Sequence, residues 1–148
     1  MKKYFLITLF CLGCAKKQTL FERISSEDSQ VLFSNEIIET EEYNILENEF
    51  VYNGGGVGIS DFNNDGLQDF YLTGNMVDNA LYINQGDFKF IEVSEISKVK
   101  GENRWSSGVA IVDINNDGLM DIYSCATMAK DPENRRNLLY VNKGNNSD

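Results

Sequence analysis

An internal repeat restricts the fold of this chain more than any other feature of its 148 residues. The segment 56–71 (GVGISDFNNDGLQDFY) aligns without a gap on the segment 108–123 (GVAIVDINNDGLMDIY). Further on, 79–86 (NALYINQG) matches 137–144 (NLLYVNKG), but at an offset six residues longer. A repeat of roughly 50 residues is typical of solenoids and propellers, in which each unit is one small supersecondary element.

The six additional residues of the second unit fall near 130–136 (KDPENRR). This stretch holds the only proline of the chain and a cluster of charges. Insertions of this composition are tolerated in exposed connections. We therefore expect a surface loop there.

Within each unit, short apolar segments alternate with turn residues. In the first unit the apolar segments are separated by NNDG, GNMVDN and NQGD, and they are rich in aromatic and β-branched residues. This pattern predicts four short antiparallel strands, the composition of a propeller blade. The fold class expected is all-β, with β-propeller-like blades of four antiparallel strands, one complete and one truncated.

Four segments follow from this division of the chain. Residues 1–13 are expected to be a lipoprotein signal peptide and 14–52 a tether with an acidic N-terminal segment. Residues 53–105 would form the first blade, and 106–148 the second, truncated blade. Within the acidic segment, the apolar stretches 31–33 and 50–52 are expected to add edge strands.

The N-terminus has the features of an export signal. Two lysines follow Met1, and residues 4–12 (YFLITLFCL) form an apolar run too short to span a bilayer as a helix. The next residues, LGCA, resemble a bacterial lipobox, in which Cys14 takes the lipid and becomes the mature N-terminus. Cys11 stands where a leucine is common, so ordinary cleavage after Ala15 remains an alternative. In both cases the chain is exported.

Each repeat also contains the acidic pattern D-x-N-x-D-G-x-x-D. Oxygen-bearing side chains at loop positions 1, 3, 5 and 9 suit a hard cation such as Ca²⁺, and the glycine permits a sharp turn. By analogy with other such loops, the carbonyl of position 7 adds a ligand, with the leucine side chain pointing into the core. The predicted calcium ligands are Asp61, Asn63, Asp65, Leu67 and Asp69 in the first loop, and Asp113, Asn115, Asp117, Leu119 and Asp121 in the second.

The alternative is that NNDG is only a hairpin turn. A turn alone requires neither Asp61 nor Asp69, whereas both repeats keep an aspartate at these positions. An EF-hand is a poor fit because its twelfth loop position needs a glutamate, and Leu72 and Ser124 stand there.

Charge and composition exclude several classes of function. The formal charge is −10, so nucleic acid is not an expected partner. The chain has no histidine, which excludes a Ser-His-Asp triad and His-ligated zinc. Cys125 is expected to be a small buried hydrophobe, and Trp105 and Tyr123 are expected in the core rather than in sugar stacking.

The doubled loop and its flanks resemble the FG-GAP or VCBS-type repeat, the calcium-loop blade of integrin-α-like β-propellers. NGGGVG before the first loop, WSSGVA before the second and LYxNxG after each are similar to exported bacterial relatives of cartilage acidic protein. The resemblance implies a seven-bladed propeller with calcium loops in certain blades. Such proteins serve adhesion, ligand binding or scaffolding and are generally not catalysts.

The function expected is that of a non-catalytic calcium-binding module in a lipid-anchored protein of the bacterial cell envelope, at the outer membrane. Its partners would be a protein or carbohydrate ligand, with membrane contact through the lipid alone. Two alternatives stay open. One is a portion of a propeller-type enzyme acting on polysaccharide through paired carboxylates, and the other is an inactive fragment of a larger repeat protein.

Overall fold

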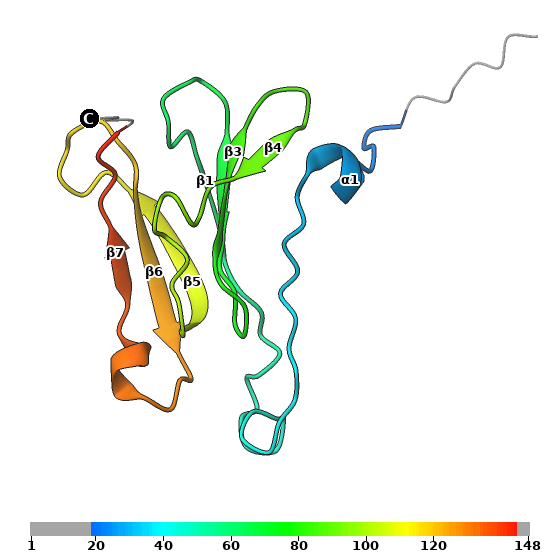
Figure 1. Ribbon diagram of the computed structural model, residues 1–148, viewed down its shortest axis with the longest axis vertical. Helices are drawn as coiled ribbons and strands as arrows, with labels where there is room; N and C mark the ends of the chain where they lie inside the picture. Colours follow the sequence, from blue (N-terminus) through cyan, green and yellow to red (C-terminus); the bar gives the residue numbers. More distant parts are fainter. Residues whose placement is uncertain (1–18, 145–148) are drawn as a thin grey trace, which may run out of the picture.

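The computed structural model describes residues 19–144, which form two antiparallel sheets with almost no helix (Figure 1). The helical elements are one turn of α-helix, α1 (Ser26–Ser29), and one turn of 3-10 helix, η1 (Pro132–Arg135). The all-β fold class is therefore confirmed. The expected signal peptide and Cys14 lie outside the described residues.

The first sheet is a four-stranded meander in the order β1-β2-β3-β4. Its strands are β1 (Val57–Ser60), β2 (Asp69–Leu72), β3 (Ala80–Asn84) and β4 (Phe90–Glu92). Tight turns rich in Asn, Asp and Gly join them, as the sequence predicts. The first unit thus has the four strands expected of a blade.

The second sheet has three strands in the order β5-β6-β7. They are β5 (Trp105–Val112), β6 (Asp121–Thr127) and β7 (Leu138–Tyr140). The register of β5 against β6 shifts between Ser106 and Val109, which marks a bulge. The charged connection expected near 130–136 contains η1 and lies exposed between β6 and β7.

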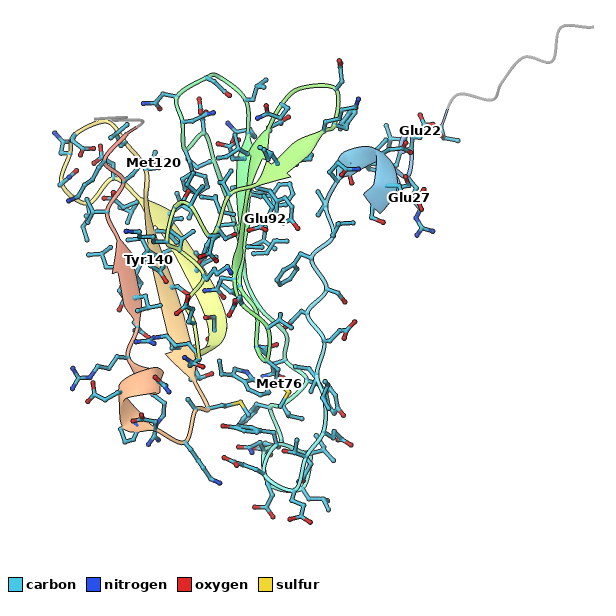
Figure 2. All side chains as sticks on the ribbon, viewed as in Figure 1. Glu22, Glu27, Met76, Glu92, Met120 and Tyr140 are labelled. Carbon is cyan, nitrogen blue, oxygen red and sulfur yellow. The ribbon has the colours of Figure 1, made fainter. Side chains whose placement is uncertain are left out.

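The core lies between the two sheets. Its buried members come from both repeats and from the segment that joins them: Phe62, Tyr71, Leu81, Val99 and Ile122. Half-buried side chains of the second sheet, including Ile111 and Tyr140, pack against them. Figure 2 shows Tyr140 on the side of β7 that is turned toward the first sheet.

A glycine allows the sheets to approach each other. A Cβ atom at Gly58 on β1 would lie 2.6 Å from Cδ1 of Ile111 on β5. Such a distance is too short for two carbon atoms without a shift of the isoleucine. The second repeat has Ala110 at the equivalent position.

Residues 19–56 contain no strand, so the expectation of edge strands at 31–33 and 50–52 is wrong. Residues 31–38, which we call the strap, run along the side of the first sheet that faces away from the second (Figure 1). The Leu32 amide donates to Tyr82 Oη at 3.2 Å, and the Ile38 amide donates to the sulfur of Met76, a residue labelled in Figure 2. The strap therefore lacks a ladder of backbone hydrogen bonds.

Residues 50–52 form turns instead of a strand, and Val51 is fully buried there. Nearby, Tyr43 stacks on Trp105, with ring centroids 5.4 Å apart. Within residues 19–144, no helix has the length and apolar character needed to cross a membrane.

Candidate functional site: the two acidic loops

The two acidic loops lie at the same end of the molecule. One joins β1 to β2 and the other joins β5 to β6 (Figure 1). A hydrogen bond ties the two regions, because Asn142 Nδ2 donates to the carbonyl of Phe62 at 2.8 Å. The packing of the sheets therefore gathers both sets of carboxylates on one side of the structure.

The first loop is folded around its own side-chain oxygens. Asp61 accepts hydrogen bonds from the amides of Asp65 at 3.0 Å and Gly66 at 2.8 Å. Asn63 Oδ1 accepts from the same Asp65 amide at 3.2 Å, and its Nδ2 donates to the Asp65 carboxylate at 2.8 Å. Asp65 in turn accepts from the Leu67 amide at 2.8 Å. The oxygens of positions 1 and 3 thus converge on one amide nitrogen.

The second loop repeats this arrangement bond for bond. Asp113 accepts from the amides of Asp117 at 3.0 Å and Gly118 at 2.8 Å, and Asn115 bonds to Asp117 as its counterpart does. The Leu119 amide donates to Asp117 at 2.9 Å. The backbones agree too, since Gly66 has φ 89° and Gly118 has φ 85°. A positive φ of this size favours glycine, which accounts for its presence at position 6 of both loops.

The aspartate at position 9 faces inward instead of into solvent. Asp69 is fully buried, and its two oxygens accept from the amides of Phe62 and Asn84, each at 2.8 Å. Asp121 is equally buried and accepts from the amides of Ile114 at 3.0 Å and Asn142 at 2.8 Å. Each position-9 carboxylate therefore joins the base of its loop to the end of the third strand of its sheet.

Burial raises the pKa of Asp69, and the nearby charges of Asp65 and Asp61 raise it further. The amides of Asn84 and Phe62 act in the opposite direction because they favour the ionised form. Asp69 is thus close enough to the other two carboxylates of its loop to be repelled by them. A cation among these groups would offset that repulsion.

The chemistry of the donors fits a hard cation. Every predicted ligand offers oxygen, and no ion pair found in residues 19–144 includes a loop carboxylate. Over the same residues, however, no three Asp, Glu, Cys or His side chains are grouped closely enough to hold a metal ion. The reason is visible in the loops, where the carboxylates are turned to backbone amides. The structure thus shows the donors and their loop, and the ligand assignment itself stays a prediction.

Several side-chain expectations can be compared with the structure directly. Leu67 is 38% exposed, so the expectation that it points into the core is wrong, and Leu119 is only half-buried. Trp105 is buried, as expected, but Tyr123 is partly exposed. Cys125 is half-buried on β6 instead of fully buried.

Two further pairs of repeated asparagines, which the sequence analysis did not single out, make equivalent hydrogen bonds within each sheet. Asn84 Oδ1 accepts from the Gly86 amide, and Asn142 Oδ1 accepts from the Gly144 amide in the same way. Asn79 Nδ2 donates to Tyr71 Oη at 2.8 Å, and Asn137 Nδ2 donates to Tyr123 Oη at the same distance. The repeat carries their signal, because all four asparagines lie in the segments that match at the longer offset.

Comparison with known families identifies the repeat. Residues 61–124 match the FG-GAP-like repeat family, and the match begins at the first loop aspartate and runs through the second loop into β6. No curated protein and no solved structure matched the chain. The expected resemblance to FG-GAP repeats is confirmed, and residues 61–124 of this chain are an FG-GAP-like repeat.

Proposed function

We propose that this chain is a non-catalytic calcium-binding module of an exported, lipid-anchored envelope protein, serving adhesion, ligand binding or scaffolding. The observation that carries the proposal is the identical hydrogen-bond pattern of the two acidic loops. FG-GAP repeats typically bind calcium, which supports the same reading.

In the first loop the ligands would be the side chains of Asp61, Asn63, Asp65 and Asp69 together with the carbonyl of Leu67. The corresponding residues of the second loop would hold a second ion. Bound Ca²⁺ would supply positive charge to carboxylates that otherwise repel one another. Calcium suits such a loop better than Mg²⁺, which prefers a smaller octahedral site and retains several waters.

Calorimetric titration of the metal-free chain with CaCl₂ tests this part of the proposal. We expect two ions per chain, falling to one in Asp65→Ala and one in Asp117→Ala, with a higher melting temperature when calcium is bound. Asp87→Asn is the matched control, because it removes an exposed carboxylate from the β3–β4 turn at the same end of the first sheet. Unchanged melting and no binding heat at millimolar calcium would refute the calcium assignment.

The lipid anchor rests on the sequence around Cys14. We expect a labelled palmitate to be incorporated into the full chain and to disappear in Cys14→Ser, while Cys11→Ser keeps the label. Labelling that persists in Cys14→Ser, or never occurs, would refute anchoring at this residue. Membrane fractionation of the same variants reports whether the lipid alone holds the chain at the envelope.

The proposal of a binding role without catalysis rests on the repeated acids themselves. All six carboxylates of the two loops accept hydrogen bonds from backbone amides, an arrangement that stabilises turns. A panel of acidic and neutral polysaccharides tests both roles at once. Binding without release of reducing ends is the expected result, whereas release that Asp69→Ala and Asp121→Ala abolish would favour the polysaccharide-active alternative.

A further inference from the structure

The first sheet buries one of its faces against the second sheet. On that face, Gly58, Tyr71 and Leu81 lie directly opposite one another across β1, β2 and β3. Tyr71 is 0% exposed and Leu81 is 6% exposed. Residues of the second sheet cover them, since Ile111 and Ile122 belong to the same core.

The second sheet carries the same row of residues on the side turned away from the first sheet. Ala110, Tyr123 and Leu139 lie opposite one another across β5, β6 and β7. Tyr123 is 37% exposed and Leu139 is 46% exposed. We call this side the open face, and its apolar members are Ala110, Val112, Tyr123, Leu139 and Val141. A surface that is buried in the first repeat is therefore left exposed by residues 19–144 in the second.

The surface that would cover the open face is also present in the chain. Ile111, Ile122 and Tyr140 cover the first sheet, and their counterparts in the first repeat lie on the side of the first sheet opposite to its core. We call this side the far face, and its members are Val57, Ile59, Phe70 and Tyr82. Val57 is 61% exposed and Ile59 is 63% exposed, whereas Phe70 is half-buried and Tyr82, which bonds to the strap, is 3% exposed.

We propose that the open face binds the far face of a second copy of this chain, head to tail, and so continues the sheet-on-sheet packing that joins the two repeats within one copy. The partner is a second copy because the complementary residues are those of this chain's own first sheet. A head-to-tail contact uses two different surfaces, so it leads to a closed ring or to an open filament.

The strap has to yield for the two faces to meet fully. It contacts the far face at β3, where the hydrogen bond from the Leu32 amide to Tyr82 Oη holds it. Docking of a second copy would replace this contact with apolar burial. We therefore expect the Leu32 amide to exchange its hydrogen faster in the assembled protein than in the monomer.

Ala110, which replaces the glycine of the first repeat, is compatible with the contact between two copies. At the equivalent Gly58, the close neighbour is the end of the Ile111 side chain, not backbone. In the contact between copies, Ala110 would therefore meet the end of Ile59. A different rotamer of that isoleucine makes room for one methyl group.

Two variants that block one face each provide the test. Leu139→Glu places a charge on the open face, and Ile59→Glu places one on the far face. Sedimentation of the full chain in a non-ionic detergent, from micromolar to millimolar concentration, should show wild-type species at multiples of the monomer mass. Each variant should be monomeric, with an apparent dissociation constant raised at least about tenfold. Mixed together, the two variants should form a one-to-one dimer, because each retains the face that the other lacks.

The control is Ile96→Glu, which adds the same charge at an exposed apolar residue outside both faces and should assemble as the wild type does. If Leu139→Glu melts earlier than the wild type, Val112→Glu on β5, the other edge strand of the same sheet, takes its place. A wild-type chain that stays monomeric up to millimolar concentration overturns the proposal. So does wild-type association with variants that remain separate on mixing, because that result excludes the head-to-tail pairing.

Discussion

Replacement of the buried aspartates separates a structural role from a metal-dependent one. Asp69 receives two amide hydrogen bonds at 2.8 Å in a fully buried site. A hydrogen bond to a charged group contributes about 1.5 to 3 kcal/mol, and a buried amide left without a partner costs about 1 to 3 kcal/mol. The cost of burying the carboxylate offsets part of this gain, so we expect Asp69→Ala to lower the free energy of unfolding by about 3 kcal/mol.

Asp121→Ala is the internal comparison. Asp121 accepts the equivalent bonds, but Ile114 is exposed and Asn142 is half-buried, so water can replace the lost acceptor. We expect a loss of only about 1 to 2 kcal/mol there.

Urea unfolding with excess chelator, followed by the fluorescence of the single tryptophan, measures both variants without a contribution from bound cation. Glu102→Ala, at an exposed position, should change the free energy of unfolding by less than about 0.5 kcal/mol. Equal losses for the two aspartates, or a loss below about 1 kcal/mol for Asp69→Ala, would refute a role of the Asp69 carboxylate in tying the loop to the third strand. A loss that appears only when calcium is present would assign Asp69 to the metal alone.

Three other perturbations have expected outcomes. Tyr71→Phe removes a buried hydroxyl that donates to the Val99 carbonyl at 2.6 Å, and should lower the free energy of unfolding in urea by about 1 to 3 kcal/mol. Tyr123 is more exposed, so Tyr123→Phe should lower it by less than about 1 kcal/mol. Equal losses would contradict the idea that burial makes the Tyr71 bond more important. Burial raises the pKa of Tyr71, so the stability that its hydroxyl contributes is complete below about pH 10 and is lost as the pH rises further. Tyr71→Phe should therefore reduce the loss of unfolding free energy at alkaline pH. An unchanged dependence of the unfolding free energy on pH would contradict this effect of Tyr71. Gly66→Ala forces an L-residue into φ 89° and should cost about 1 kcal/mol and weaken calcium binding, whereas an unchanged melting temperature would show that the loop relaxes. Tyr43→Ala exposes the buried Trp105 ring and should shift its emission to longer wavelength, and an unshifted spectrum would place other groups over the indole.

The sequence predicted the strands and the acidic loops, which depend on residues that are close together in the chain. The strands and their order follow from apolar alternation and from turns rich in Asn and Gly, and both loops take the backbone that NNDG favours, with positive φ at Asn64 and Gly66. The repeat also identified every loop aspartate. These features depend on residues that are close in sequence, and each appears twice.

Features that depend on distant partners escaped prediction. The strap lies on the first sheet through isolated contacts such as that of Leu32 with Tyr82, 50 residues away, and no residue pattern announces them. The inward turn of Asp69 has backbone amides as its partners, and every residue except proline offers one. The acidic pattern is therefore compatible with two roles for Asp69, a metal ligand and a structural hydrogen-bond acceptor. Only the fold shows that its carboxylate accepts hydrogen bonds from two backbone amides.

The sequential layout of the two sheets has a consequence for the order of folding during synthesis. All four strands of the first sheet lie within residues 57–92, so a chain that emerges N-terminus first can complete this sheet before any strand of the second has appeared. Until residues 105–140 follow, the faces that carry Tyr71 and Leu81 have no cover from their later partner. The strap emerges before either sheet, yet its bond to Tyr82 cannot form until β3 has emerged. Over that interval the partly synthesised chain exposes an apolar sheet face, which is the kind of surface that holding chaperones bind.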